Sequence, residues 1–280
     1  MDATCWKIGG TTLDLTSRAI LMGVLNVTPD SFSDGGQFFA TEAAVKHGVE
    51  MAQHGAEIID VGGESTRPGS SPISAEEELD RVLPVIEQIN RSVRPYISID
   101  TSKAAVARAA LASGATIIND ITGGRGDPAM FSLAAEKGVG LIIMHMQGTP
   151  QTMQRNPTYN DVVAEVAEFF RQQFREAVRS GVDPMTIAFD PGIGFGKTVA
   201  HNLELLANLP RLRIENRPLV VGVSRKSFLG KISGGGDAVS ATVALTSLLR
   251  ERGAHVLRVH DVMPNIHALR TTEALLAATR

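Results

Sequence analysis

The feature that most restricts the fold of this chain is an alternation of short, apolar, β-branched runs with longer helix-like segments. The apolar runs are AILMGVLN (19–26), AEIIDVGG (56–63), PYISIDT (95–101), ATIINDI (115–121), VGLIIMHM (139–146), TIAFDPG (186–192), PLVVGVS (218–224) and HVLRVH (255–260). A strand followed by a helix, repeated eight times within about 250 residues, is typical of a (β/α)8 barrel. We therefore predict an α/β protein with the TIM-barrel fold, in a single domain that spans residues 1–280.

A doubly wound open sheet is the main alternative fold. That fold often places a GxGxxG turn after its first strand, but here the first strand is followed by NVTPDSFSDGG (26–36). No Pro/Ser-rich linker or low-complexity tract divides the chain, which favours one domain. The segment KIGGTTLDLTS (7–17) alternates around a Gly-Gly pair. We expect it to form a short β-hairpin within residues 1–18, closing the N-terminal end of the barrel.

The helix-like segments carry recognisable end signals. They are TEAAVKHGVEMAQHG (41–55), SAEEELDRVLPVIEQIN (74–90), SKAAVARAALASG (102–114), NDVVAEVAEFFRQQFREAVRSG (160–181) and TTEALLAATR (271–280). Ser74 followed by Glu77 predicts a capping box, and Gly114 is a typical C-terminal glycine. Asn160 or Asp161 is expected to cap the longest helix.

Composition excludes several classes of partner. A formal net charge of −3 gives no broad field for nucleic acid or for an anionic membrane. No apolar run reaches the roughly 18 residues of a membrane span, and the N-terminus lacks a signal-peptide pattern. Cys5 is the single cysteine, so an internal disulfide is impossible. We expect a cytoplasmic protein that binds small molecules.

Nearly every apolar run turns polar at its end. The polar residues at or beside the ends are Asn26, Asp60, Asp100, Asn119, Asp120, His145, Asp190, Ser224, Arg225, Lys226, Arg258 and His260. Parallel strands of a barrel all point one way, so these residues gather on one rim. Barrel enzymes place their chemistry on that rim. Period-two alternation also puts Ser98 and Asp100 on one face of their strand.

Several of these residues have a purely structural interpretation. Asp100 precedes TSK and is equally consistent with a helix N-cap. We interpret Asp60 as support for the loop that follows it, and His145 as a packed residue behind the site. The remaining histidines in helix-like segments are expected at the surface: His47, His54 and His201.

Two segments suggest phosphate binding. GIGFGKT (192–198) looks like a Walker A loop, but Pro191 stands where that loop needs its first glycine. We expect its glycines to let the backbone approach a flat ligand beside Asp190. SRKSFLG (224–230) places two cations and two hydroxyls where the seventh strand enters a helix, which is the usual anion site of a barrel. Arg258 and His260 would complete that site.

The pair of segments GVLNVTPDSFSDGG (23–36) and GAEIIDVGGESTRPG (55–69) resembles the signatures of the bacterial dihydropteroate synthase family. Further stretches match that family in order and spacing: SIDTSK, IINDI, MHMQGTPQTMQ, DPGIGFGKT, VGVSRKSFLG and RVHDV. The resemblance covers nearly the whole chain, and long motifs of mixed composition are highly specific.

The resemblance implies a pterin-binding (β/α)8 barrel that joins 6-hydroxymethyl-7,8-dihydropterin diphosphate to p-aminobenzoate and releases pyrophosphate. This reaction is a step of folate synthesis. The resemblance also implies Mg²⁺ as cofactor, the two small-molecule substrates as partners, and a homodimer formed through helices outside the barrel. The apolar helix VSATVALTSLL (239–249) is a candidate for that interface, although it is equally consistent with packing on the strands.

Residue roles carry over from the matching motifs. Four residues are expected to be catalytic: Asp100, Lys226, Arg258 and Asn26, the last as the Mg²⁺ ligand. The pterin diphosphate would be held by Thr66, Asp100, Asn119, Asp190, Lys226, Arg258 and His260. The aminobenzoate would be held by Phe32, Thr66, Arg67, Pro68, Phe195 and Ser227, with Lys226 beside it. Phe32 and Asp34 would come from a first mobile loop, and 66–68 from a second.

This arrangement suits a dissociative reaction. If the C–O bond breaks first, positive charge develops on the pterin methylene, and Asp100 or Asp190 would stabilise it. The segment NVTPDSFSDGG would then close over the cation and exclude water, with Phe32 as the apolar lid.

Three other functions compete with this one. A pterin-barrel methyltransferase needs no diphosphate site, so SRKSFLG and RVH argue against it. A non-catalytic pterin- or phosphate-binding barrel would need neither mobile Gly-rich loops nor a metal-suited Asn26. A metal-dependent hydrolase is disfavoured because the chain has no HxH or HExxH cluster.

Overall fold

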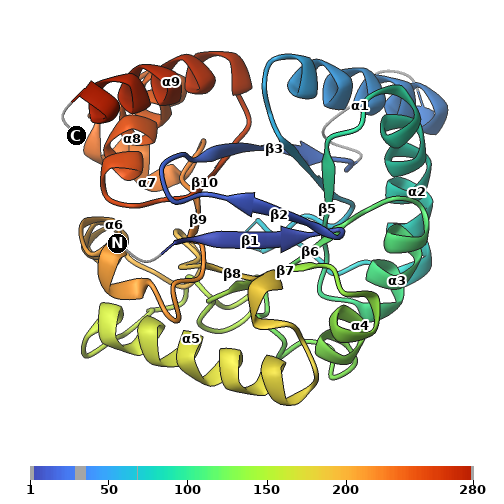
Figure 1. The fold of residues 1–280 in the computed structure, drawn as a ribbon, viewed down its shortest axis with the longest axis horizontal. Helices are drawn as coiled ribbons and strands as arrows, with labels where there is room; N and C mark the ends of the chain where they lie inside the picture. The colour runs from blue at the N-terminus through green and yellow to red at the C-terminus, as the bar shows by residue number, and fades with distance from the viewer. Residues whose placement is uncertain (1–2, 29–35, 68, 279–280) are drawn as a thin grey trace.

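The computed structural model of the chain describes residues 3–28, 36–67 and 69–278 (Figure 1). Its main sheet has eight parallel strands: β3 (Ile20–Asn26), β4 (Ile58–Gly62), β5 (Tyr96–Asp100), β6 (Ile117–Asp120), β7 (Gly140–Met144), β8 (Ile187–Asp190), β9 (Val220–Gly222) and β10 (Val256–Val259). They pair in the order β8-β7-β6-β5-β4-β3-β10-β9. A single bridge between Phe189 and Leu219 joins the two ends of this order. The predicted barrel is confirmed as a nearly closed ring.

Helices surround the ring of strands on its outside (Figure 1). They are α1 (Gly36–Gln53), α2 (Ala75–Ser92), α3 (Ala104–Ala112), α4 (Met130–Lys137), α5 (Val162–Arg179), α6 (Val199–Ala207), α7 (Ser227–Ile232), α8 (Ala238–Glu251) and α9 (Val262–Ala278). Two 3₁₀ turns, η2 (Pro184–Thr186) and η3 (Leu209–Leu212), flank β8 and α6. Residues 271–278 of the predicted terminal helix form the second half of α9, which begins nine residues earlier. No helix in the described ranges is both long enough and apolar enough to cross a membrane.

The helix ends match most of the predicted caps. The Ser74 side chain accepts a hydrogen bond from the Glu77 backbone N–H, and Asp161 caps α5 in the same way. The Glu77 carboxylate pairs with Arg81 instead of completing the predicted capping box. The interpretation of Asp100 as an N-cap is wrong, because α3 begins after Lys103 and the Asp100 carboxylate binds Arg258.

Strand side chains alternate between two apolar cores. Outward residues such as Ile97 and Ile99 pack under the helices in the larger core. Inward residues such as Ile58, Ile117 and Ile142 fill the N-terminal half of the barrel. The period-two prediction for β5 is confirmed, since Ser98 and Asp100 lie on the face opposite to the buried isoleucines.

The predicted N-terminal hairpin forms from β1 (Cys5–Ile8) and β2 (Thr11–Asp14). It lies across one end of the ring of strands (Figure 1). Trp6 and Ile8 are fully buried and join the inner apolar core. The Trp6 indole N–H donates a 2.7 Å hydrogen bond to the carbonyl of Thr186, just before β8. The hairpin therefore covers the barrel at the N-terminal ends of its strands. A site can form at the opposite rim, which the hairpin does not cover.

Candidate active site

A cavity of about 420 Å³ opens at the C-terminal ends of the strands. It gathers eight of the residues predicted from sequence: Asn26, Thr66, Arg67, Asp100, Phe195, Lys226, Arg258 and His260. These residues come from six different strand ends and loops, so only the closed ring brings them together. The parallel strands thus place the predicted residues on one rim, as expected.

Two further cavities adjoin the first and share residues with it. A small pocket of about 20 Å³ reaches deeper into the barrel and adds Asn119 and Asp190 to Asp100, Lys226 and Arg258. An open groove of about 1100 Å³ runs outward and adds Ser227. Every predicted site residue that the structure describes therefore lines one of three connected spaces. Three other predicted positions lie outside the described residues: Phe32, Asp34 and Pro68.

Arg258 forms the charged centre of the site. Its Nε donates to Asp60 at 2.6 Å, and its Nη2 donates to Asp100 at 2.7 Å. The strand register puts Asp100 beside Asn119, whose amide donates to Asp60 at 3.1 Å. One guanidinium therefore serves two carboxylates, Asp60, which is fully buried, and Asp100, which is partly exposed to the cavity.

The shared guanidinium and the burial of these groups shift the pKa values of Asp100 and Arg258. Burial and the neighbouring charge of Asp60 raise the pKa of Asp100 to about 7, although Arg258 opposes the rise. Burial lowers the pKa of Arg258, but the charges of Asp60 and Asp100 outweigh it and the net shift is upward. The guanidinium thus stays charged, while Asp100 titrates close to neutral pH.

Asp190 holds the start of the next loop. One of its carboxylate oxygens accepts a 2.7 Å hydrogen bond from the Gly192 N–H, and burial raises the pKa of Asp190. Gly192 has φ +64°, and a Cβ at this position would lie 1.9 Å from the His145 carbonyl oxygen. Glycine is therefore required there, because the loop crosses the end of β7 in direct contact with its backbone.

Lys226 lies over the Phe195 ring, with its ammonium nitrogen 4.1 Å from the ring centroid. Burial and the charge of Arg258 lower the pKa of Lys226 to about 8, so it remains mostly protonated at neutral pH. A lysine packed on an aromatic face presents a cation and a flat apolar surface to the same cavity.

His260 and Arg225 line the same cavity as Arg258 and Lys226. The Nδ1 atom of His260 lies 3.0 Å from the Ser224 hydroxyl. Burial and the charge of Arg258 lower the pKa of His260 to about 3, so the ring is neutral at neutral pH. Arg225 has a left-handed backbone, φ +57°, and pairs with Asp261 through two contacts of 2.7 and 3.2 Å.

The glycine-rich segment 192–198 does not present its lysine to a phosphate. Lys197 is only 3% exposed, and its ammonium contacts the His145 ring Nδ1 and the Phe195 carbonyl, each at 3.0 Å. Burial lowers the pKa of Lys197 to about 7. This placement agrees with the prediction that the segment is not a nucleotide P-loop.

The interpretation of Asp60 from the sequence is wrong. Asp60 was interpreted as support for its loop, but it is fully buried inside the barrel and binds Arg258. The signal was present, because Asp60 follows Ile58 by two residues and must share its inward face. The surface position predicted for His47 is confirmed, and from α1 this residue also lines the cavity.

The described residues contain no group of three or more His, Cys, Asp or Glu side chains that could hold a metal ion. The amide of Asn26 is the one predicted metal ligand at the rim, and it lines the same cavity as Arg258 and His260. Mg²⁺ prefers oxygen ligands and often keeps waters and substrate phosphates in its shell. A single amide oxygen is compatible with an ion that arrives together with a diphosphate.

Comparison with known proteins agrees with this geometry. A family model described as "Pterin binding enzyme" matches residues 22–260. The dihydropteroate synthase of Escherichia coli (strain K12) is 48% identical over 271 residues, which cover 96% of this chain and 95% of that protein. The chain belongs to the dihydropteroate synthase family.

Solved structures of dihydropteroate synthases share the fold over almost their full length. The Xanthomonas albilineans enzyme with 4-aminobenzoic acid superimposes with a TM-score of 0.91 at 42% identity, and the match covers 99% of both chains. The dihydropteroate synthase from the same organism in complex with 7,8-dihydropteroate gives a TM-score of 0.88 at 41% identity, over 98% of this chain and 99% of that one. The resemblance inferred from the motifs is thus confirmed, and the chain is a transferase of the dihydropteroate synthase family.

Proposed function

We propose that the protein, with residues 1–280 acting as one pterin-binding domain, condenses 6-hydroxymethyl-7,8-dihydropterin diphosphate with p-aminobenzoate and releases pyrophosphate. The observation that carries this proposal is the meeting of buried carboxylates with Arg258 and Lys226 in connected cavities at one end of the barrel. Family membership supports it, as do the relatives' structures with 4-aminobenzoic acid and 7,8-dihydropteroate.

The deep pocket suits the pterin ring. A pterin edge offers a row of hydrogen-bond donors and acceptors, which Asp100, Asn119 and Asp190 can match from the barrel interior. Charge-assisted hydrogen bonds of this kind contribute about 1.5–3 kcal/mol each. Lys226 would contact the same ring from above.

The cationic rim suits the diphosphate. Arg258 uses Nε and Nη2 for its two carboxylates, which leaves Nη1 for a phosphate oxygen. If the Ser224 hydroxyl donates to Nδ1 of His260, the neutral ring carries its proton on Nε2 and can donate it to the leaving group. Asn26 would hold Mg²⁺ with the diphosphate, and the bound ion would neutralise charge on the departing oxygens.

The proposed reaction begins with cleavage of the C–O bond between the pterin methylene and the diphosphate. Positive charge then spreads from the methylene into the ring, where ionised Asp100 and Asp190 stabilise it. The arylamine nitrogen attacks through its lone pair, forms the C–N bond and gives up a proton to the released pyrophosphate. The protein mainly positions this weak nucleophile, so no covalent enzyme intermediate is required.

The aminobenzoate would lie in the outer groove. Phe195 offers a flat face there, while Thr66, Arg67 and Ser227 line the groove around it. Arg67 is exposed and would attract the carboxylate of the arylamine. The predicted contacts of Phe32 and Pro68 would complete this half of the site.

A single assay tests the proposal. The purified protein is mixed with the pterin diphosphate, p-aminobenzoate and Mg²⁺, and both pyrophosphate and 7,8-dihydropteroate are quantified. We expect equimolar formation of the two products. Pyrophosphate release without coupled product would indicate a diphosphatase. Formation of neither product would contradict the proposal, and a separate incubation with methyltetrahydrofolate and a corrinoid would then test the methyltransferase.

We further propose that the protein is a homodimer through the outer face of α8. Leu248 on that helix is 44% exposed, and Met263 on the neighbouring α9 is 42% exposed, although the other side of α8 packs on α9. Light scattering coupled to size exclusion should give twice the chain mass, and Leu248→Glu should give the chain mass. A cytoplasmic location, and the lack of nucleic-acid and membrane partners, stay predictions from the sequence.

A further inference from the structure

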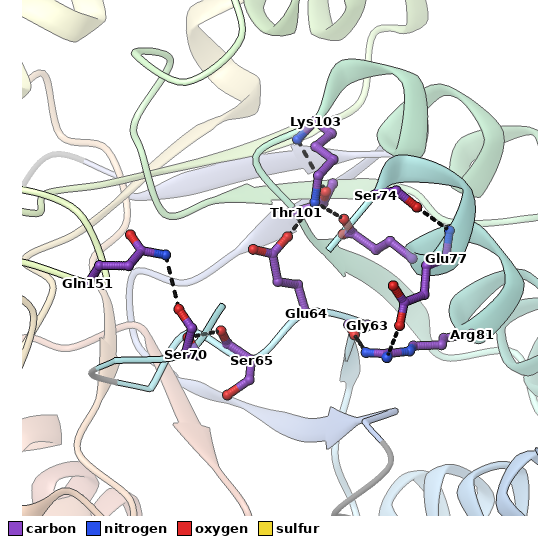
Figure 2. A network of polar contacts seen from close by, with 11 residues as sticks. Gly63, Glu64, Ser65, Ser70, Ser74, Glu77, Arg81, Thr101, Lys103 and Gln151 are labelled. Carbon is purple, nitrogen blue, oxygen red and sulfur yellow. Dashed lines mark hydrogen bonds and ion pairs between the residues drawn. The ribbon is translucent and has the colours of Figure 1, made fainter. Parts of the chain in front are cut away.

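The loop 63–74, between β4 and α2, carries Thr66 and Arg67 to the cavity and is tied at both ends (Figure 2). At its tip, Gln151 donates to the Ser70 carbonyl at 3.0 Å. At its root, Arg81 donates to the Gly63 carbonyl at 2.7 Å, and Glu64 binds Lys103. Nothing in the proposed chemistry uses Glu64 or Lys103, yet their contact decides how the loop leaves its strand.

Lys103 joins three parts of the barrel at one point. It lies three residues after Asp100, at the N-cap of α3, and its ammonium contacts both Glu64 in the loop and Glu78 in the first turn of α2. The ammonium group therefore fixes the root of the loop relative to the strand end that carries Asp100. Figure 2 shows Lys103 directed at Glu64 across the gap between loop and helix.

The charges around Lys103 make its contacts with Glu64 and Glu78 strong. Glu78 is fully buried, and a buried carboxylate without a cation costs several kcal/mol, so Lys103 cannot leave it without penalty. Burial lowers the pKa of Lys103, but the hydrogen bonds to Glu64 and Glu78 outweigh it and raise the pKa above its ordinary value. Lys103 thus stays charged at neutral pH, and its ammonium contacts Glu78 in the core and Glu64 in the loop.

We propose that Lys103 is a positioning residue for the arylamine: by holding Glu64 it places Thr66 and Arg67 over the outer groove. The inference deepens the proposed function and rests on it. Glu64 precedes Thr66 by only two residues, so a change at the root is transmitted directly to the side chains that face the groove. The deep pterin pocket contains no residue of this loop and should be insensitive to it.

Two substitutions separate positioning from simple stabilisation. Glu64→Gln releases the loop while Lys103 still neutralises Glu78, and Lys103→Gln removes the cation itself. We expect each to raise the KM for p-aminobenzoate about tenfold. The double variant should be no worse than either single one, because both remove the same contact. Calorimetry should show the Kd of 6-hydroxymethyl-7,8-dihydropterin, which lacks the diphosphate and needs only the deep pocket, changed by less than about twofold.

The matched control is Arg108→Gln on α3, which removes an exposed ion pair with Glu136 that touches no loop of the site. Arg108→Gln should leave both the KM for p-aminobenzoate and the Kd measured by calorimetry unchanged. Lys103→Arg retains the cation and should recover most of the lost arylamine affinity. If Lys103→Gln does not fold, Glu64→Gln alone still tests the proposal, because the ion pair between Lys103 and buried Glu78 is intact in that variant.

Amide hydrogen exchange of residues 63–74 gives a readout that does not need turnover. Exchange in this loop should accelerate in Glu64→Gln and not in Arg108→Gln. Unchanged KM and exchange in Glu64→Gln, additive effects in the double variant, or an equal loss of affinity for 6-hydroxymethyl-7,8-dihydropterin would each overturn the proposal. A wild-type protein that makes no dihydropteroate would instead refute the proposed function. The exchange data would still show whether the contact between Glu64 and Lys103 orders the loop.

Discussion

At the residue scale, the site depends on how Arg258 divides its hydrogen bonds. Asp60 and Asp100 are close enough to share one guanidinium, so their negative charges also repel each other. Burial is the main cause that raises the pKa of Asp100 to about 7, and the charge of Asp60 adds to the rise. Asp100 therefore titrates in the pH range where the enzyme would work, which is common at functional sites.

Asp100→Asn tests the role of that carboxylate. The amide keeps the size of the side chain and can still accept from Arg258, but it carries no charge to stabilise a pterin cation. We expect turnover to fall by about 10²-fold or more, with the fold retained. Pyrophosphate release measures the first effect and thermal denaturation by circular dichroism the second. The same substitution at the α5 cap, Asp161→Asn, is the control, and near-normal turnover of Asp100→Asn would remove it from the proposed role.

The pH dependence of kcat/KM should follow from two shifted groups. The carboxylate of Asp100 is needed for cation stabilisation, so activity should fall as the pH drops below about 7. The ammonium of Lys226 is needed at the rim, so activity should also fall as the pH rises above about 8. A steady-state profile from pH 5 to 10 should therefore be bell-shaped, because kcat/KM reports the free enzyme.

Lys226→Arg identifies the alkaline limb. A guanidinium stays protonated throughout this range, so the upper limb should move to higher pH while the lower limb remains. An upper limb that does not move would assign it to another group, such as a substrate.

At the scale of the elements, the loop from β8 to α6 is held by several contacts with its neighbour. Tyr159 donates to the Gly196 carbonyl at 2.9 Å, and Gln154 donates to the Gly194 carbonyl at 2.7 Å. Buried Lys197, which belongs to the loop itself, contacts the His145 ring just after β7. These contacts come from the preceding βα loop, so Phe195 is positioned by a neighbouring element and not by its own strand alone.

Gly192→Ala should disturb this loop. The added Cβ would meet the His145 carbonyl oxygen, and alanine disfavours the positive φ, so the loop must shift away from β7. We expect about 1–3 kcal/mol lower free energy of unfolding and a higher KM for p-aminobenzoate. Urea denaturation and steady-state kinetics measure the two effects. Gly230→Ala in α7, where a Cβ meets nothing within 4 Å, should change neither by a comparable amount.

At the scale of the whole molecule, the barrel interior divides into two halves along its axis. The end covered by the hairpin is filled with apolar side chains, and the opposite end holds the carboxylates, amides and cations. Stability and chemistry therefore depend on different ends of the same strands. Substitutions in the apolar end should affect unfolding and spare the catalytic constants.

Trp6→Phe tests this separation. The smaller ring leaves a void and removes the donor to the buried Thr186 carbonyl, which should lower the free energy of unfolding by about 1–3 kcal/mol. Urea denaturation followed by circular dichroism measures the loss. Both KM values should remain unchanged because Trp6 lies at the other end of the barrel. Val178→Ala on the exposed side of α5 is the control, and a raised KM in Trp6→Phe would show that the two ends are coupled.

Much of this protein is determined by the local sequence. Apolar runs with polar ends fix eight strands and point their polar residues at one rim, since side chains in a strand alternate strictly between two faces. The caps at Ser74 and Asp161 follow from side chains that bond to nearby backbone, and so they too are visible in the sequence. The long motifs were sufficient to predict the family.

Only the tertiary structure decided the pairing of charges. Asp60 and Arg258 are separated by 198 residues along the chain, and Lys103 meets Glu64 and Glu78 across three elements. Periodicity places each side chain on a face, but it cannot say which strand lies opposite or how deep a group is buried. Closure of the ring brings β10 beside β3, one strand away from β4, and so decides that one arginine serves two carboxylates.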